Sequence, residues 1–151
     1  MPQSHSAVYV HLVFSTKERR PWLRDLKLRT DLFGFLVGVS RQLDCPCPAI
    51  GGFEDHIHIL GRLHRTITQA DWVKELKRVS NSWIKDQPNG EKDFSWQSGY
   101  GIFSISSSKL DTVKEYVLRQ EEHHRKTTFQ EEYRILLKRH GLEWDESYVW
   151  E

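Results

Sequence analysis

The sequence predicts one α+β domain of the ferredoxin-like, split βαβ class over residues 1–151. Segments with the composition of strands and segments with the apolar spacing of helices follow one another as strand, helix, strand, strand, helix, strand. In addition, 151 residues with 38% hydrophobic content can fill one core but not two. We therefore expect an antiparallel sheet with helices on one face and an extra C-terminal helix.

The first half of the chain supplies a strand, a helix and a hairpin. Residues Ala7 to Phe14 are β-branched and aromatic, which is typical of a buried strand. From Asp25 to Leu43 apolar residues recur at spacings of three and four, which predicts a helix, and a Cys-Pro-Cys-Pro sequence ends it. Two short strands, Ala49 to Phe53 and His56 to Arg62, are joined by a tight turn at Glu54-Asp55.

The second half repeats the helix and the strand. Thr68 is suited to cap a helix from Gln69 to Lys85, whose apolar residues lie on one side. The sequence from Asp86 to Asp93 is rich in turn-forming residues and predicts a loop. Alternation from Tyr100 to Ser106 predicts the fourth strand.

Two further helices and an aromatic tail follow this strand. We expect Ser108 to cap a helix running from Lys109 to roughly His124, and Gly141 to end a shorter helix from Phe129 to His140. The last ten residues contain three aromatic side chains, Trp144, Tyr148 and Trp150. Because so many aromatics would be unfavourable in water, we expect this tail to dock on its own chain or on a partner.

Charge and composition exclude several classes of protein. The 22 Lys and Arg residues nearly balance the 21 Asp and Glu residues, so a uniformly basic nucleic-acid-coating protein is not indicated, although local clusters can form one basic face. No apolar run reaches the roughly 20 residues that span a bilayer, and the N-terminus lacks the layout of a secretion signal. Cys45 and Cys47 are too close in the sequence for a disulfide bond between them to cross-link distant parts of the fold. We expect a cytoplasmic protein without membrane partners.

The first candidate chemical motif is His56-Ile57-His58. Alternate residues of a strand point to the same face, so both imidazoles leave one face about 6.5 Å apart along the backbone, while Ile57 points to the core. Two imidazoles so placed can hold one divalent ion, although two ligands alone do not make a site.

The second candidate motif is Tyr116 with Gln120. They stand four residues apart on a predicted helix and therefore share a face. A phenol with an ordinary pKa of about 10 is a poor nucleophile unless a cation makes its target more electrophilic. The alternative is an ordinary aromatic residue beside a surface glutamine.

The two motifs together resemble the single-tyrosine transposases of the HUH class, including those of insertion sequences and their REP-associated relatives. The resemblance covers nearly the whole chain, through the segments HLVFSTK from His11, HIHIL from His56, FSWQSGYG from Phe94 and YVLRQEEHH from Tyr116. It implies that His56, His58 and Gln120 hold Mg²⁺ or Mn²⁺, and that Tyr116 attacks the scissile phosphate.

The implied activity is cleavage and strand transfer of single-stranded DNA through a 5′-phosphotyrosine intermediate. The covalent bond conserves the energy of the broken phosphodiester, so no nucleotide cofactor is needed, in agreement with the lack of a GxxxxGK[ST] phosphate loop. The family also implies a homodimer, with Tyr116 acting in its own or its partner's site, and a DNA hairpin as substrate. We expect six basic residues to bind that hairpin: Lys17, Arg19, Arg20, Lys74, Lys77 and Arg78.

Other interpretations of single residues stay open. His123 or His124 could assist the ion or be a surface residue, and His11 is better suited to support a neighbour than to bind metal. Cys45 and Cys47 alone do not make a zinc site.

Three other functions also remain. The first alternative is a domesticated protein that binds DNA hairpins without transposition activity, although the chain retains all four site residues. A two-histidine RNA phosphoesterase would need two separate His-x-Thr/Ser motifs, whereas His58 is followed by Ile59-Leu60. An RNA-binding domain would need exposed aromatics on the sheet, where the central strand instead presents histidines.

Overall fold

Six elements in the first two thirds of the chain build the sheet and one helical layer. In the computed structural model, which describes residues 2–151, they are β1 (Val8–Ser15), α1 (Leu26–Gln42), β2 (Ala49–Gly52), β3 (His56–Leu63), α2 (Gln69–Asp86) and β4 (Gly101–Ile105). Each lies within two residues of its predicted range. Thr68 caps α2 as expected, because its side chain accepts a hydrogen bond from the Asp71 amide.

The strands form one antiparallel sheet in the order β2-β3-β1-β4. This order and the βαββαβ sequence of elements confirm the ferredoxin-like fold class. In the central pair, Val13 of β1 lies opposite His58 of β3, and Ser15 lies opposite His56. The register therefore brings one side of β1 next to both histidines.

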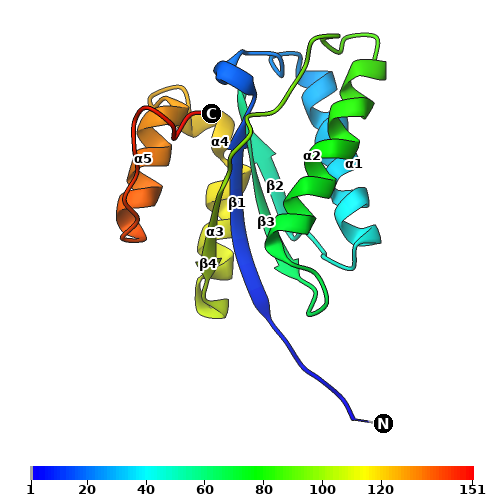
Figure 1. The fold of residues 1–151 in the computed structure, drawn as a ribbon, viewed down its shortest axis with the longest axis vertical. Coiled ribbons are helices and arrows are strands. Elements are labelled where there is room, and N and C mark those ends of the chain that lie inside the picture. Colours follow the sequence, from blue (N-terminus) through cyan, green and yellow to red (C-terminus); the bar gives the residue numbers. More distant parts are fainter. Residues whose placement is uncertain (1) are drawn as a thin grey trace.

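Helices cover both faces of the sheet, whereas the sequence predicted helices on one face only (Figure 1). The helices α1 and α2 pack on one face, where the main core gathers Leu12 and Phe14 of β1, Ile57 and Ile59 of β3, and Trp72 of α2. The opposite face carries the C-terminal helices α3 (Leu110–Leu118), α4 (Gln120–His123) and α5 (Phe129–Arg139). The extra C-terminal helix α5 thus completes a second helical layer, over the face that holds His56 and His58.

The prediction of a single helix from Lys109 to His124 is wrong in two details. Ser108 is not the cap: Ser106 caps a short 3-10 turn, Ser107–Lys109, by accepting from the Ser108 amide, and α3 then begins after Lys109 without a side-chain cap. The helix is also interrupted at Arg119, whose backbone (φ −99°, ψ 21°) leaves the helical region. Neither glycine nor proline marks this interruption in the sequence.

The aromatic tail docks on its own chain, one of the two outcomes that the sequence left open. Trp150 packs beside Phe129 and Tyr133, and the Glu151 carbonyl accepts from the Gly99 amide at 2.9 Å. Tyr148 remains exposed. The tail therefore fixes α5 against the end of the sheet.

Gly51 determines how closely α3 approaches the sheet. A Cβ at this position would lie 1.9 Å from the Val117 carbonyl oxygen, whereas a Cβ at Gly34, inside α1, would meet nothing within 4 Å. We expect Gly51→Ala to lower the free energy of unfolding by about 1–3 kcal/mol because α3 must move. Gly34→Ala, the matched control, should raise it by about 0.5–1 kcal/mol. Urea unfolding of both variants checks this, and equal stabilities would contradict the close α3–sheet contact.

Among the helices of residues 2–151, none is both long and apolar enough to cross a membrane.

Candidate functional site

His56 and His58 lie side by side on the buried face of β3. Both side chains are fully buried and their ring centroids are 5.2 Å apart, while Ile57 and Ile59 point into the core on the other face. The alternation expected from the His-x-His sequence is thus confirmed. The pair faces the layer formed by α3, α4 and α5.

The interruption of the helix at Arg119 places Gln120 over these histidines. Gln120 is 1% exposed, and its Oε1 lies 3.4 Å from His56 Nε2. Its amide nitrogen donates to the Tyr116 carbonyl at 3.1 Å, so its oxygen is the atom directed to the imidazoles. The structure therefore brings together the two motifs that the sequence places some sixty residues apart.

Tyr116 lies beside the histidine pair of its own chain. Its ring packs edge-on against His58 and His11, with centroid distances of 5.8 Å and 6.0 Å. The hydroxyl donates a hydrogen bond to Glu132 Oε2. Burial, followed by the negative charge of Glu132, raises the pKa of Tyr116 above its ordinary value. In this state the phenol is protonated and held in place.

Glu132 is a site residue that the sequence interpretation missed. It projects from α5, is 2% exposed and accepts from His58 Nε2 at 2.8 Å through Oε1. Although burial alone would raise its pKa, the neighbouring His58 and His124 hold the pKa of Glu132 below its usual range. One signal was available: Glu132 falls within the buried stripe of α5, between Phe129 and Leu136, where a carboxylate without partners is costly.

His124 belongs to the site, whereas His123 lies at its edge. The His124 side chain is 2% exposed, and its Nε2 lies 2.9 Å from Gln120 Oε1 and 3.0 Å from Glu132 Oε1. The His123 side chain is 37% exposed, with Nε2 3.3 Å from Glu132 Oε2. Of the two interpretations that the sequence allowed for these histidines, participation in the site fits His124 better.

His11 and Asp55 orient the two strand histidines through contacts with their Nδ1 atoms. His11 Nε2 and His58 Nδ1 share a hydrogen bond of 2.7 Å, and burial lowers the pKa of His11 to about 3. His56 Nδ1 lies 2.7 Å from Asp55 Oδ1 in the hairpin turn. His11 therefore takes the supporting position that the sequence favoured over metal ligation.

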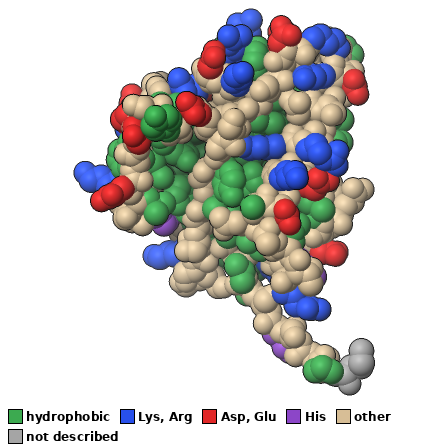
Figure 2. Space-filling view, viewed as in Figure 1, with side chains coloured by type: hydrophobic (Ala, Val, Ile, Leu, Met, Phe, Trp, Pro, Cys, Tyr) green, Lys and Arg blue, Asp and Glu red, His purple; other side chains and the backbone are tan. Residues whose placement is uncertain are grey.

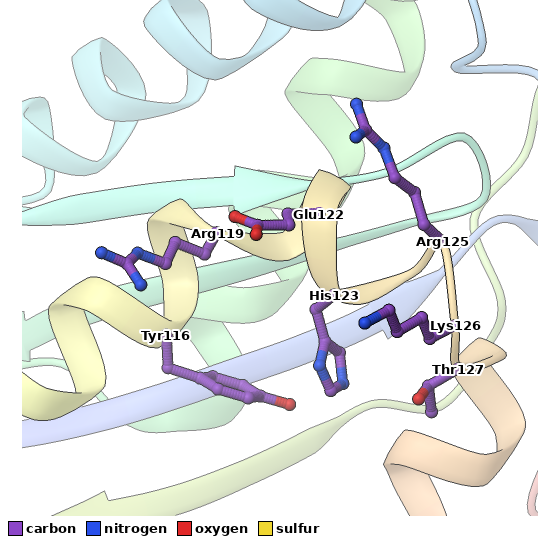
Figure 3. A pocket seen from close by; sticks show the side chains of 7 residues that line it. All are labelled: Tyr116, Arg119, Glu122, His123, Arg125, Lys126 and Thr127. Carbon is purple, nitrogen blue, oxygen red and sulfur yellow. The ribbon is translucent and has the colours of Figure 1, made fainter.

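A cavity of about 500 Å³ opens beside Tyr116 (Figure 3). In this view the Tyr116 hydroxyl is directed toward the His123 ring, and Lys126 and Thr127 lie beyond it. Arg119 and Arg125 also line the cavity. Three cationic side chains beside the Tyr116 phenol suit a chain of phosphates.

The six residues predicted to bind DNA lie on the segment after β1 and on α2. Lys17, Arg20, Lys74 and Arg78 are exposed, although Arg20 pairs with Glu18 and Arg78 with Glu75. Arg19 stacks over the Trp150 ring, with its guanidinium carbon 5.6 Å from the centroid. Figure 2 shows Lys and Arg side chains interspersed with Asp and Glu on the α2 side rather than a uniformly basic face. Their role in DNA binding stays a prediction.

Lys77 differs from the other five because its ammonium is engaged inside the protein. It donates to the carbonyls of Gln97, Ser98 and Gly99 at 2.7–3.3 Å, and burial lowers the pKa of Lys77 to about 8. We expect Lys77→Met to lower the free energy of unfolding by about 1–3 kcal/mol, and Lys74→Met on the exposed side of α2 to change it by less than about 0.5 kcal/mol. Thermal unfolding of both variants checks this, and equal stabilities would leave Lys77 free to bind DNA.

Comparisons with known proteins agree with this architecture. The family model described as "Transposase IS200 like" matches residues 4–120. A crystal structure of a candidate transposase from Deinococcus radiodurans R1 is 22% identical, with a TM-score of 0.58, covering 80% of this chain and 98% of that one. A REP-associated tyrosine transposase bound to a REP hairpin is 15% identical, with a TM-score of 0.56, covering 78% and 70% of the two chains. No match was found among curated proteins.

Proposed function

Because the chain belongs to the family of IS200-like transposases, we propose that it cleaves and rejoins single-stranded DNA through a 5′-phosphotyrosine intermediate at Tyr116. One observation carries the proposal: the Tyr116 phenol lies within the same buried cluster as the His56–His58 pair and Gln120 of its own chain. A phenol, two imidazoles and an amide oxygen are the groups that this chemistry requires.

The donor set fits a divalent cation. Imidazole nitrogens and amide or carboxylate oxygens bind Mn²⁺ well, and the oxygens also suit Mg²⁺. The inward oxygen of Gln120 lies 2.9 Å and 3.4 Å from two imidazole nitrogens, and within residues 2–151 it meets no donor other than these rings. We propose that His56, His58 and Gln120 hold the ion, which when bound would withdraw electron density from the scissile phosphate.

The residues of the chain then supply positioning and the nucleophile. The Tyr116 hydroxyl gives up its proton to Glu132, which accepts its hydrogen bond, and the Tyr116 oxygen forms a bond to phosphorus. The bond from phosphorus to the 3′ oxygen breaks, and the released 3′ oxygen takes up a proton. The 5′ side of the strand stays attached to Tyr116 until a 3′ hydroxyl attacks and reverses the step. Because the phosphodiester energy is retained, the cycle needs no nucleotide cofactor.

The cavity beside Tyr116 is the proposed path of the strand. Arg119, Arg125 and Lys126 can neutralise neighbouring phosphates without reading sequence. A structural neighbour was solved with a REP hairpin, which supports a hairpin as the substrate here, bound in part by the exposed residues Lys17, Arg20 and Lys74.

The arrangement within one chain supports action of Tyr116 in its own site. We propose a homodimer, as in the family, in which each chain holds a complete set of site residues. Dimerisation would then serve the joining of two DNA ends rather than the assembly of the chemical groups.

The most direct test is covalent capture of single-stranded DNA. We expect labelled hairpin-bearing element ends with Mn²⁺ to give a protein–DNA adduct on denaturing gels, and EDTA to abolish it. Hairpin binding without any adduct would favour the domesticated hairpin-binding protein instead. Neither binding nor an adduct would contradict both functions.

A further inference from the structure

Two side chains of the site, His124 and Glu132, lie beyond residue 120, where the match to the family model ends. Building on the proposed function, we propose that both are ligands of the same divalent ion as His56, His58 and Gln120. The centre would then hold three imidazole nitrogens and two oxygens, and it would bind a transition-metal ion in the absence of DNA.

The outer contacts of two imidazoles determine which nitrogen faces inward as a free acceptor. His124 Nδ1 lies 2.6 Å from the Thr127 carbonyl oxygen, and His56 Nδ1 lies 2.7 Å from an Asp55 carboxylate oxygen. Neither oxygen can donate a hydrogen, so each Nδ1 must carry the proton. In the neutral rings, Nε2 of His56 and of His124 therefore presents a lone pair to the interior.

The oxygens that meet these nitrogens are acceptors as well. The Gln120 amide nitrogen is turned outward to the Tyr116 carbonyl, which leaves Oε1 inside. Glu132 Oε1 faces the same point, 3.0 Å from His124 Nε2 and 3.7 Å from His56 Nε2. Four lone-pair donors thus converge. His58 Nε2, 2.8 Å from Glu132 Oε1, becomes the fifth when the His58 ring carries its proton on Nδ1 and donates it to His11 Nε2. A cation is the partner that satisfies such a set.

The spacing of these donors suits a single ion. Ligand bonds of about 2.1 Å place neighbouring donor atoms roughly 3.0–3.4 Å apart. The ligand atoms of His56, His58, His124 and Glu132 lie within 4.8 Å of one another, and Gln120 Oε1 is 2.9 Å from His124 Nε2. Small side-chain shifts are enough for all five to meet one centre.

The composition of this donor set indicates the class of ion. Imidazoles favour the transition metals from Mn²⁺ to Zn²⁺, whereas Mg²⁺ prefers oxygen ligands and retains water. A third imidazole from His124 therefore moves the preference of the site away from Mg²⁺. The carboxylate of Glu132 also links the ion to the nucleophile, because its other oxygen accepts from the Tyr116 hydroxyl.

Titration of the DNA-free protein with CoCl₂, followed by visible absorption and calorimetry, tests this assignment. We expect one Co²⁺ per chain, displaced by MnCl₂ more readily than by MgCl₂. Glu132→Gln and His124→Asn should each weaken Co²⁺ binding by at least about tenfold and alter the absorption bands. The amide introduced by His124→Asn can still donate to the Thr127 carbonyl, which limits any effect on folding. Glu131→Gln, an exposed neighbour on α5, is the matched control and should bind like the parent.

The outcomes separate this inference from the proposed function. Unchanged Co²⁺ affinity and spectrum in both folded variants, as judged by circular dichroism, would overturn the roles of His124 and Glu132. If the DNA-free parent protein bound no Co²⁺, the roles of His124 and Glu132 would also be overturned. The proposed function would still stand, with an ion that binds together with the DNA phosphate. If the His56→Ala variant bound Co²⁺ like the parent protein, the histidine pair would not hold the ion. The metal site of the proposed function would then be wrong as well.

Discussion

The Tyr116→Phe variant should form no covalent DNA adduct and still bind the hairpin. The substitution removes one oxygen atom, the proposed nucleophile, and keeps the ring that packs against His58 and His11. Losing a nucleophile lowers turnover by several orders of magnitude, so we expect adduct formation to fall by at least about a thousandfold. Hairpin affinity should change by less than about threefold, because phosphate-binding cations rather than the phenol supply it. Denaturing gels and a filter-binding assay measure the two quantities.

Two other tyrosines of the chain provide the controls for this prediction. Tyr133 is buried beside Phe129 and Trp150, and Tyr148 is exposed in the tail. Tyr133→Phe and Tyr148→Phe should both form the adduct at the parent rate. If the Tyr116→Phe variant formed the adduct, or if either control variant lost it, the assignment of Tyr116 as the nucleophile would be wrong.

His56→Ala should lose metal-dependent cleavage. His56 is fully buried and oriented by Asp55, and its Nε2 lies 3.4 Å from Gln120 Oε1, so no solvent-exposed side chain can replace it. We expect cleavage with saturating Mn²⁺ to drop at least about a hundredfold, since an ion at a reacting phosphate contributes several kcal/mol. Cleavage of labelled single strands across a series of Mn²⁺ concentrations measures the loss.

His64→Ala is the control for loss of a histidine. His64 lies just beyond the far end of β3, bonded to Thr66 and away from the site. Its replacement should leave cleavage and its Mn²⁺ dependence unchanged. Parent-like cleavage by His56→Ala would remove the metal site from the mechanism, whatever the fate of Tyr116.

Local periodicity was enough to predict the parts of the site that lie within single elements. The two-residue repeat of a strand predicted that His56 and His58 share a face, and the four-residue spacing of a helix predicted that Tyr116 and Gln120 do. The structure has both arrangements. Each depends only on backbone geometry over one to four residues.

The parts that were not predicted depend on contacts between distant elements. Glu132 reaches the site because α5 packs across the sheet face, and nothing local to its sequence indicates which strand it meets. The interruption at Arg119 follows no helix-breaking residue, and it occurs where α3 lies against Gly51 of β2. Tertiary packing overrides helix periodicity there. The break itself, between Tyr116 and Gln120, was therefore not predicted.

Mapping of the covalent adduct by tandem mass spectrometry tests the central claim most directly. The parent protein is incubated with a single-stranded hairpin substrate and Mn²⁺, digested with nuclease and protease, and searched for peptides that carry a nucleotide phosphate. The account predicts the modification on the Tyr116 phenol, with a free 3′ hydroxyl on the released strand. A nucleotide on Tyr133, on Tyr148 or on a residue other than tyrosine, or cleavage with no covalent species at all, would contradict it.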